Sequence, residues 1–361
     1  MVIKTLRDFN FKNKKVLVRC DFNVPLSWKG EINILDDFRI KKTLPTIHHL
    51  KKEGAKVILM SHLGRPSEEP ENREKYSLKP IAQRLETFLK EKVKFLPDDI
   101  GERVKNEIEK MKEGEVILLE NLRFYKEEEQ NDLGFAKKLA ALGDIYINDA
   151  FSASHRAHAS ISGICQFLPS GAGFLLEREV DTLTNLIKNS KKPLVGIIGG
   201  IKVETKARVI DRLSEIANFI LIGGMISQEV KEKEIKFQNS QKVIHPVDMV
   251  GTFDIGPKTI KLFQEKIRGA KTIFWAGPLG KIEEKEYQKG SKAIARAIIK
   301  SGAFSVIGGG ETVEFMNEVG LTSKFNFVST GGGAMLEFLS GKKLPGIEAL
   351  CSALASLDHN S

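Results

Sequence analysis

Short runs of apolar residues alternate with longer amphipathic stretches along most of the 361-residue chain. Each run is followed by turn residues and then by a segment with helical character. Uninterrupted apolar strands that alternate with helices are typical of parallel sheets covered by helices on both faces. The pattern therefore predicts an α/β fold, with strands at 16–18, 57–60, 116–119, 145–147, 194–198, 219–222, 272–275, 304–307 and 327–328.

The length and the grouping of these strands predict two domains, because 361 residues exceed one ordinary hydrophobic core. The first four strands are followed by charged residues and the last five by glycines, and the division falls near 171–173. We predict two Rossmann-like lobes: 1–173 together with a C-terminal helix at 346–361, and 174–345. Residues 174–188 form one amphipathic helix that serves as the hinge between the lobes.

The charge and the cysteines restrict the function classes. The net charge is +9, but the lysine-rich runs mix with acids and lack interleaved aromatics. This favours a solvated surface, or small polyanionic substrates, over a nucleic-acid partner. The three scattered cysteines have no metal-ligand spacing, and neither a membrane span nor a signal peptide is found. We expect a cytoplasmic monomer that acts on small molecules, with no membrane partner.

Four arginines stand at or near the ends of the first four strands: Arg39, Arg65, Arg123 and Arg156. Ligands of open α/β sheets bind at the carboxyl ends of the strands. The planar guanidinium binds carboxylate and phosphate groups bidentately, so four arginines at one edge indicate a small ligand with both groups. For any single arginine, a surface pair with an acid is an equally good interpretation.

Three further side chains accompany these arginines. Asp21 and Asn23 follow the first strand and can accept hydrogen bonds from substrate hydroxyls. His62 follows the second strand in Ser-His-Leu-Gly-Arg-Pro, a place that favours the site over a histidine buried in the core.

The last five strands end in glycine-rich turns, whose backbone N–H groups at helix starts bind phosphate. No Walker A motif is present, so a nucleotide would not be held by a P-loop. Lys202 follows one of these turns, and Lys206 is expected on the same helical face. Glu311 is either a Mg²⁺ ligand or an ordinary acid at a helix start, and the spacing leaves both open. The turns are at 199–200, 223–224, 277–280, 308–310 and 331–333.

Seven motifs, in order along nearly the whole chain, resemble the phosphoglycerate kinase family. They are ValLeuValArgCysAspPheAsnValPro (16–25), LeuMetSerHisLeuGlyArgPro (59–66), LeuLeuGluAsnLeuArgPhe (118–124), AsnAspAlaPheSerAlaSerHisArgAlaHisAlaSer (148–160), GlyGlyIleLysValGluThrLys (199–206), AspIleGlyProLysThr (254–259) and ValSerThrGlyGlyGlyAlaMetLeuGluPhe (328–338).

The resemblance implies reversible phosphoryl transfer between 1,3-bisphosphoglycerate and ADP, giving 3-phosphoglycerate and ATP in glycolysis, with Mg²⁺ as the cofactor. It implies substrate binding by Asp21, Asn23, Arg39, His62, Arg65, Arg123 and Arg156. It implies catalysis by Arg39, Lys202, Gly332 and Gly333. It implies nucleotide binding by Gly199, Gly200, Lys202, Lys206, Gly223, Gly224, Glu283, Gly310, Glu311, Thr312 and Gly331, with Glu311 as the metal ligand.

The sequence departs from the family pattern only in the second lobe. Ala276 replaces the usual asparagine before Gly-Pro, and Glu311 replaces the usual aspartate. The stretch between Met225 and Pro246, and the stretch from there to Asp254, are shorter than in the family. Two alternatives therefore remain: a non-catalytic binding protein on the same fold and, on charge alone, a nucleic-acid-binding protein.

Overall fold

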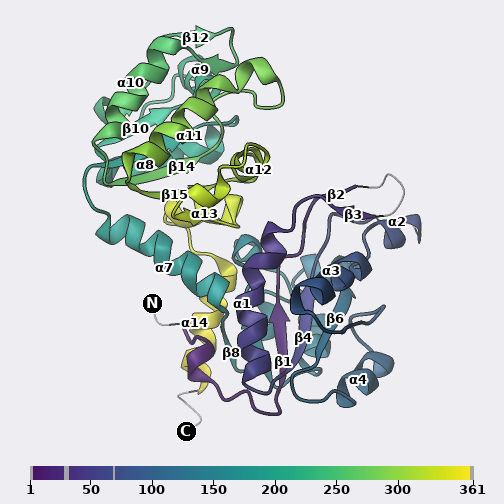
Figure 1. Cartoon of the computed structure of the whole chain (residues 1–361). Coiled ribbons are helices and arrows are strands. Elements are labelled where there is room, and N and C mark those ends of the chain that lie inside the picture. Colours follow the sequence, from purple (N-terminus) through teal and green to yellow (C-terminus); the bar gives the residue numbers. More distant parts are fainter. Residues whose placement is uncertain (1–2, 28–31, 68–69, 358–361) are drawn as a thin grey trace. The chain divides into compact units, whose positions relative to one another are not determined.

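The computed structural model describes residues 3–27, 32–67 and 70–357, and the chain divides into two compact units (Figure 1). The first unit comprises Met1–Glu179 and Lys343–Ser361, and the second comprises Val180–Lys342. The division falls inside helix α7 (Phe174–Asn189), the segment expected to form a single helix. The lobe boundaries predicted from the sequence lie a few residues away from this division.

The first unit contains a six-stranded parallel sheet in the order β5-β6-β4-β1-β7-β8. The four strands predicted here are present, and the sequence missed the two edge strands. Both missed strands have only three residues. The strand at 93–95 has a lysine at its centre, and the strand at 170–172 consists of Ser, Gly and Ala, so neither gives an apolar run. The strands are β1 (Lys15–Arg19), β4 (Lys56–Ser61), β5 (Val93–Phe95), β6 (Val116–Asn121), β7 (Ile145–Asn148) and β8 (Ser170–Ala172).

Helices connect these strands, and a small hairpin of β2 (Leu26–Ser27) and β3 (Asn33–Ile34) follows β1. The helices of the first unit are α1 (Phe38–Lys52), α2 (Pro70–Lys75), α3 (Lys79–Leu89), α4 (Glu102–Glu109), α5 (Lys126–Glu129), α6 (Leu133–Ala140) and α14 (Pro345–Leu357). Its 3-10 helices are η1 (Leu6–Asp8), η2 (Leu122–Phe124), η3 (Phe151–Ala153) and η4 (Gly163–Gln166).

Alternation along the strands buries both faces of this sheet. Val16 and Val18 of β1 belong to one core cluster, which also holds Ile47 of α1 and Leu85 of α3. Tyr146 of β7 lies between Ile145 and Ile147 of the same cluster but is not part of it, and its hydroxyl donates a 2.7 Å hydrogen bond to the Ser160 carbonyl. Burial on both faces explains why the strands are apolar throughout.

The C-terminal helix α14 belongs to the first unit, where it contacts β8 and η4. The Gly346 amide donates to the Ser154 carbonyl at 2.9 Å, and Ile347 and Leu350 are buried. Leu354 and Leu357 follow Ile347 and Leu350 at helical spacing, and their side chains lie outside the described part.

The second unit contains another six-stranded parallel sheet, in the order β11-β10-β9-β14-β15-β16. The five strands predicted here are present, and the two-residue edge strand β11 was missed. The strands are β9 (Leu194–Ile198), β10 (Phe219–Ile222), β11 (Val243–Ile244), β14 (Thr272–Ala276), β15 (Phe304–Gly308) and β16 (Phe327–Val328), with a hairpin of β12 (Met249–Val250) and β13 (Asp254–Ile255).

Gly302 follows α11 in the left-handed conformation, with φ of 68°, which favours glycine at the C-terminal end of a helix. The helices of this unit are α8 (Glu204–Ile216), α9 (Gly224–Glu232), α10 (Pro257–Arg268), α11 (Lys289–Ser301), α12 (Gly310–Glu318) and α13 (Gly332–Leu339). Its 3-10 helices are η5 (Ser240–Lys242), η6 (Lys285–Tyr287) and η7 (Thr322–Lys324). None of the helices in the described ranges has the length and apolar character needed to cross a membrane.

Candidate functional site

Four neighbouring strands of the first sheet, β6, β4, β1 and β7, deliver the predicted polar residues to one edge of the sheet. Because these strands are parallel, their carboxyl ends meet at this edge, and Arg39 joins them from the first turn of α1. We call this group the charged edge. It consists of Asp21, Asn23, Arg39, His62, Arg65, Arg123 and Arg156.

Asp21 and Arg39 form an ion pair at the centre of the charged edge. Arg39 Nη1 lies 3.1 Å from Asp21 Oδ2 and donates to the Asn23 carbonyl at 2.9 Å. Asp21 is buried and also accepts hydrogen bonds from the Ser152 hydroxyl and the Asn23 amide. Burial opposes ionisation of Asp21, but Arg39, His62 and these hydrogen bonds outweigh it, so the pKa of Asp21 lies well below its ordinary value. The carboxyl is therefore an anion that fixes the guanidinium of Arg39.

The turn after β4 is held by side chains from two neighbouring loops. Asn23 Oδ1 accepts from the Gly64 amide at 2.8 Å, and Arg123 Nη1 donates to the Gly64 carbonyl at 2.6 Å. Arg123 Nε also forms a 3.0 Å ion pair with Glu129 Oε1. Asn121, at the end of β6, accepts from the Leu63 and Arg123 amides. The predicted residues Asn23 and Arg123 are thus brought together around Gly64.

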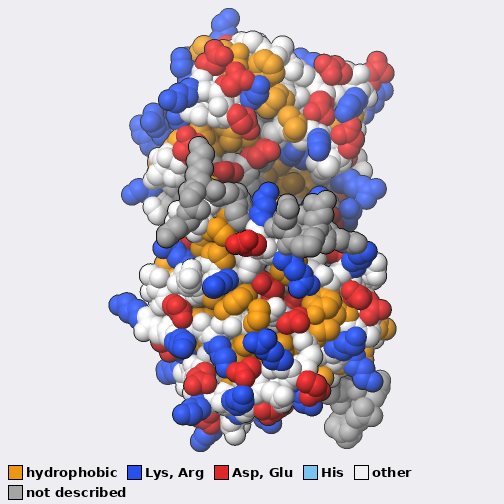
Figure 2. Space-filling view, turned by 90° about the vertical axis from the view of Figure 1, so that its right-hand side faces the viewer, with side chains coloured by type: hydrophobic (Ala, Val, Ile, Leu, Met, Phe, Trp, Pro, Cys, Tyr) orange, Lys and Arg blue, Asp and Glu red, His pale blue; other side chains and the backbone are white. Residues whose placement is uncertain are grey.

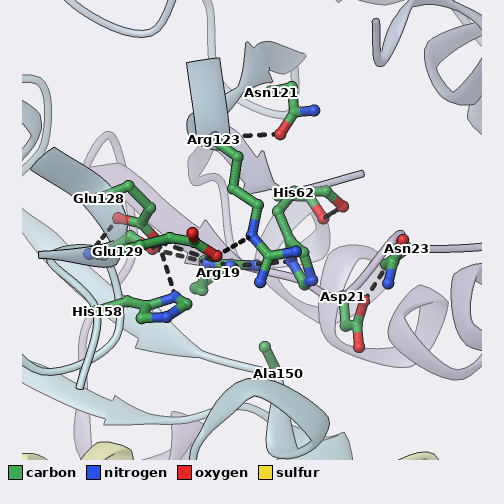
Figure 3. Close-up of polar contacts among 12 residues, drawn as sticks. Arg19, Asp21, Asn23, His62, Asn121, Arg123, Glu128, Glu129, Ala150 and His158 are labelled. Atoms are coloured by element: carbon green, nitrogen blue, oxygen red, sulfur yellow. Dashed lines mark hydrogen bonds and ion pairs between the residues drawn. The ribbon is translucent and has the colours of Figure 1, made fainter. Parts of the chain in front are cut away.

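A buried arginine that the sequence analysis did not select lies beneath this edge. Arg19, at the end of β1, is inaccessible to solvent, and its Nη2 is 3.1 Å from His62 Nδ1 (Figure 3). Its Nε donates to Ser160 Oγ at 2.8 Å, and its Nη2 lies 3.8 Å from Glu128 Oε1. The available signal was an arginine that directly follows the apolar run of a buried strand, where a charge requires partners.

Two histidines at this edge are held in the neutral state. Burial, followed by the positive charges of Arg19, Arg123 and Arg39, lowers the pKa of His62 well below its ordinary value, although Asp21 opposes this shift. Burial and neighbouring arginines likewise lower the pKa of His158 to about 3. At neutral pH the positive charge of the charged edge therefore comes from its arginines, whereas His62 provides hydrogen bonds.

The remaining two arginines are more accessible. Arg65 follows Gly64 directly and is exposed, and Arg156 is half-buried, with its Nε 3.2 Å from His155 Nε2. On the face shown in Figure 2, lysines and arginines are interspersed with acids over most of the surface. At the charged edge, by contrast, four arginines accompany a single acid, Asp21. This arrangement suits an anionic ligand.

The second sheet presents its glycine turns along one edge in the same way. The turns after β10, β9, β14, β15 and β16 follow the order of neighbouring strands, and we call them the glycine edge. Gly199 and Gly200 donate to the Ala276 and Pro278 carbonyls at 2.9 and 2.6 Å. A Cβ on Gly199 would lie 2.1 Å from the Pro278 carbonyl oxygen, so only glycine fits there.

The other turns of the glycine edge also approach one another closely. A Cβ on Gly223 would lie 3.1 Å from the Gly199 Cα, and one on Gly332 would lie 3.1 Å from the Gly309 Cα. Gly224, Gly310 and Gly332 are the first residues of α9, α12 and α13, and Gly333 follows in the first turn of α13. Gly331 immediately precedes α13, and its amide donates to Ser329 Oγ at 3.2 Å.

The expectation that Lys202 and Lys206 share a helical face is wrong. Helix α8 begins at Glu204, and Lys202 has φ of 64°, in the left-handed region. The reason is that the chain turns sharply between Gly200 and the helix, which the spacing of the lysines does not reveal. Lys202 is exposed, whereas Lys206 lies in α8 and donates a hydrogen bond to the Ile201 carbonyl. Burial lowers the pKa of Lys206, although Glu311 and Glu229 oppose the shift.

Three predicted nucleotide residues differ in exposure. Glu283 and Glu311 are exposed, and Glu311 lies in the first turn of α12. Thr312 is fully buried, and its Oγ1 accepts from the Gly277 amide at 2.9 Å. No cluster of three or more metal-ligating side chains occurs among the described residues. Because Mg²⁺ is commonly held by one or two carboxylates together with substrate phosphates, a single exposed carboxylate such as Glu311 fits this ion.

Comparisons with known proteins agree with this architecture. A family model described as phosphoglycerate kinase matches residues 6–240 and 225–342. The phosphoglycerate kinases of Borrelia hermsii (strain HS1 / DAH) and Borrelia garinii subsp. bavariensis are 42% and 44% identical, and each alignment covers 97% of this chain and 100% of the relative. The solved phosphoglycerate kinases of Coxiella burnetii and Pyrococcus horikoshii OT3 align with TM-scores of 0.82 and 0.85 at 33% and 31% identity, covering 97% of this chain and 99% of each structure.

The two sheets and these matches define a phosphotransferase, a kinase of glycolysis. The chain belongs to the phosphoglycerate kinase family. The alignments with the two Borrelia relatives span 395 and 396 positions, more than the 361 residues of this chain, so the relatives carry residues that it lacks. The two matched segments of the family model overlap at 225–240, within the stretch that is shorter than in the family.

Proposed function

We propose that the charged edge binds 3-phosphoglycerate or its acyl phosphate, and that the glycine edge binds ATP or ADP. The observation that carries this proposal is the pairing of Arg39 with an ionised, buried Asp21, next to Arg123 and a neutral His62. A guanidinium fixed in this way is prepared for a bidentate contact with a carboxylate or phosphate, and loses little side-chain entropy on binding.

Within this proposal the residues of the charged edge have distinct tasks. Arg39, Arg65, Arg123 and Arg156 bind the anionic groups of the ligand. Asp21 and Asn23 accept hydrogen bonds from its hydroxyl, and neutral His62 adds a hydrogen bond without adding charge. Arg39 also stabilises charge on the transferring phosphoryl group, which gives it a catalytic task in addition to its binding task.

For the glycine edge, we infer that the backbone amides of the turns contact the nucleotide. Gly199, Gly200, Gly223 and Gly224 border the base, and Gly310 and Gly331 border the phosphates. Gly332 and Gly333 add amides at the start of α13, where the helix dipole favours negative charge. Lys202 and Lys206 add positive charge, Glu283 is a further nucleotide contact, and Thr312 acts by holding the turn at Gly277.

Glu311 would hold Mg²⁺ together with phosphate oxygens of the nucleotide. The bound ion would neutralise charge on those phosphates. For the chain's own residues, catalysis consists of in-line positioning and charge stabilisation, with Lys202 at the transferring phosphoryl group, and no covalent enzyme intermediate is needed. A Glu311→Gln variant would raise the Mg²⁺ concentration required for half-maximal nucleotide binding, and unchanged binding would remove Glu311 from this role.

The residue assignments are tested by comparing Arg65→Ala with Lys202→Ala. Arg65→Ala would raise KM for 3-phosphoglycerate about tenfold with little change in kcat, because a binding contact is lost. Lys202→Ala would lower kcat with little change in that KM, because its contact belongs to the transition state. Exposed Lys289, at the start of α11, offers a matched control as Lys289→Ala. The same kinetic effect in all three variants would contradict the division of roles.

We also propose that the protein acts in the cytoplasm as a monomer with small-molecule partners. All three cysteines carry free thiols, which suits a reducing compartment. Light scattering at micromolar concentration would give a mass near 40.2 kDa for a monomer, and twice that mass would contradict it.

A further inference from the structure

The carboxylate of Glu229 reaches from α9 to the loop that follows β9. Its Oε1 accepts from the Lys202 amide at 2.9 Å, and its Oε2 accepts from the Val203 amide at 2.9 Å. Both amides immediately precede α8, which begins at Glu204. One side chain thus binds two consecutive backbone N–H groups of the segment that carries Lys202.

This contact depends on an unusual backbone conformation. Lys202 has φ of 64°, whereas Val203 is right-handed, with φ of −55° and ψ of −32°. Consecutive residues of opposite hand turn their N–H groups toward one point and form a small anion-binding nest. The left-handed conformation is unfavourable for lysine because of its Cβ, so it persists only where other contacts hold it. The Glu229 carboxylate is such a contact.

The surroundings keep Glu229 ionised and in place. Hydrogen bonding from the Val203 amide, followed by the Lys202 amide and Lys233, lowers the pKa of Glu229 although burial opposes the shift. Lys233, one turn later, lies 3.3 Å from Glu229 Oε2 and also pairs with Glu204. On the other side of Lys202, Lys206 donates to the Ile201 carbonyl. The loop is therefore fixed immediately before and after the Lys202 side chain.

We propose that Glu229 is a positioning residue: by accepting hydrogen bonds from the Lys202 and Val203 amides, it holds the Lys202 backbone in the conformation that presents its ammonium group for phosphoryl transfer. This inference rests on the proposed role of Lys202. Because a misplacement of about 1 Å in a catalytic group can cost up to about a hundredfold in rate, loosening this loop would lower kcat. The charged edge is in the other unit, so KM for 3-phosphoglycerate would not change.

The test compares Glu229→Ala and Glu229→Gln with Glu204→Gln. Glu229→Ala removes both acceptors and is expected to lower kcat about tenfold. Glu229→Gln keeps the shape but only one acceptor oxygen, so its kcat would be intermediate. Glu204 pairs with the same Lys233, whereas the Lys202 and Val203 amides both donate to Glu229. Glu204→Gln is therefore a charge-matched control, with kcat within twofold of the wild type.

A double variant separates the inference about Glu229 from the proposed role of Lys202. In a Lys202→Ala enzyme, the further change Glu229→Ala would lower kcat no more, because Glu229 acts through Lys202. If Lys202→Ala alone leaves kcat unchanged, the proposed role of Lys202 fails. If Lys202→Ala lowers kcat but Glu229→Ala does not, or if the two losses add, the inference about Glu229 is overturned.

Amide hydrogen exchange gives a readout without activity. The Val203 amide would exchange faster in Glu229→Ala than in Glu204→Gln. The exchange is measured by NMR on the full chain, with each variant held at the same interval below its own melting temperature. Glu229→Gln serves the same comparison if the alanine variant does not fold. A lower melting temperature with unchanged kcat and unchanged Val203 exchange would indicate a merely structural contact, and would overturn the proposal.

Discussion

Arg39 Nη1 lies 3.1 Å from Asp21 Oδ2, although the two residues come from the first turn of α1 and the loop after β1. The same guanidinium nitrogen donates to the Asn23 carbonyl at 2.9 Å. The orientation of Arg39 is therefore set by the loop after β1 before any ligand arrives. Asp21 therefore positions Arg39, and under the proposed function both side chains contact the ligand.

Replacing Asp21 with Asn would weaken substrate binding. The amide keeps an acceptor oxygen but loses the charge that holds Arg39, and hydrogen bonds to charged groups contribute about 1.5–3 kcal/mol. We expect KM for 3-phosphoglycerate to rise about tenfold or more in steady-state kinetics. The exposed Asp181 of α7 provides the same substitution, Asp181→Asn, as a control. An unchanged KM in Asp21→Asn would exclude the carboxylate from substrate binding.

Replacing Arg19 with Met would destabilise the first unit strongly. Arg19 and Glu128 are both fully buried, and removing the cation leaves the Glu128 carboxylate without its positive partner. Breaking a buried pair in this way costs about 3–5 kcal/mol. By contrast, Arg7→Met at the exposed pair with Glu177 would cost less than about 1 kcal/mol. Urea unfolding measures the free energy of unfolding of both variants. Equal losses in the two variants would contradict the stabilising role of the buried pair of Arg19 and Glu128.

Asp149 makes the stability of the first unit depend on pH. Burial raises its pKa to about 7, although hydrogen bonds from Thr46 and the Leu175 and Leu176 amides oppose the shift. The folded protein therefore holds a proton that the unfolded chain, with a pKa of about 3.9, releases. The contribution of Asp149 to stability is therefore largest below about pH 4, falls as pH rises toward 7, and is level above.

The matching variant is Asp149→Asn, which has the same shape and does not titrate. Between pH 5 and pH 8 the wild type would lose about 2 kcal/mol of unfolding free energy that the variant retains. Denaturant unfolding at the two pH values measures the difference. Parallel losses in both proteins would assign the pH dependence to other groups.

Gly199→Ala would disrupt the glycine edge. The new Cβ would meet the Pro278 carbonyl oxygen at 2.1 Å, a backbone atom that cannot move away alone. Overpacking of this kind costs about 1–3 kcal/mol, and nucleotide affinity measured by calorimetry would fall at least tenfold. Gly269→Ala is the control, because a Cβ there meets nothing within 4 Å. Normal nucleotide binding by Gly199→Ala would contradict the proposed position of the nucleotide.

The sequence was sufficient to predict the two parallel sheets and the charged and glycine edges. Buried strands such as 57–60 are continuous apolar runs, and parallel strands bring their carboxyl ends together. The same reasoning missed β8, because Ser170, Gly171 and Ala172 have no apolar pattern and pair with β7 at the edge of the sheet. Edge strands of this kind are defined by their neighbours rather than by their own residues.

Contacts between distant segments explain what could not be predicted in the site. Glu229 and Lys202 are joined by a single hydrogen bond between a side chain and the backbone, and no local pattern relates the two residues. The left-handed conformation of Lys202 was missed because that conformation normally belongs to glycine or asparagine. The partners of Arg19 could not be predicted because Arg19 is the last residue of the buried strand β1, and its contacts Ser160 and Glu128 are more than a hundred residues away in the sequence.

Initial-rate kinetics with Mg-ATP and 3-phosphoglycerate, coupled to the detection of ADP, tests the central claim most directly. The account predicts saturable ADP formation that requires both substrates and that falls in Lys202→Ala. It also predicts the reverse reaction, ATP formation from ADP and 1,3-bisphosphoglycerate. A folded protein that binds 3-phosphoglycerate in calorimetry but turns over neither substrate pair would contradict the account and favour a non-catalytic binding protein on the same fold.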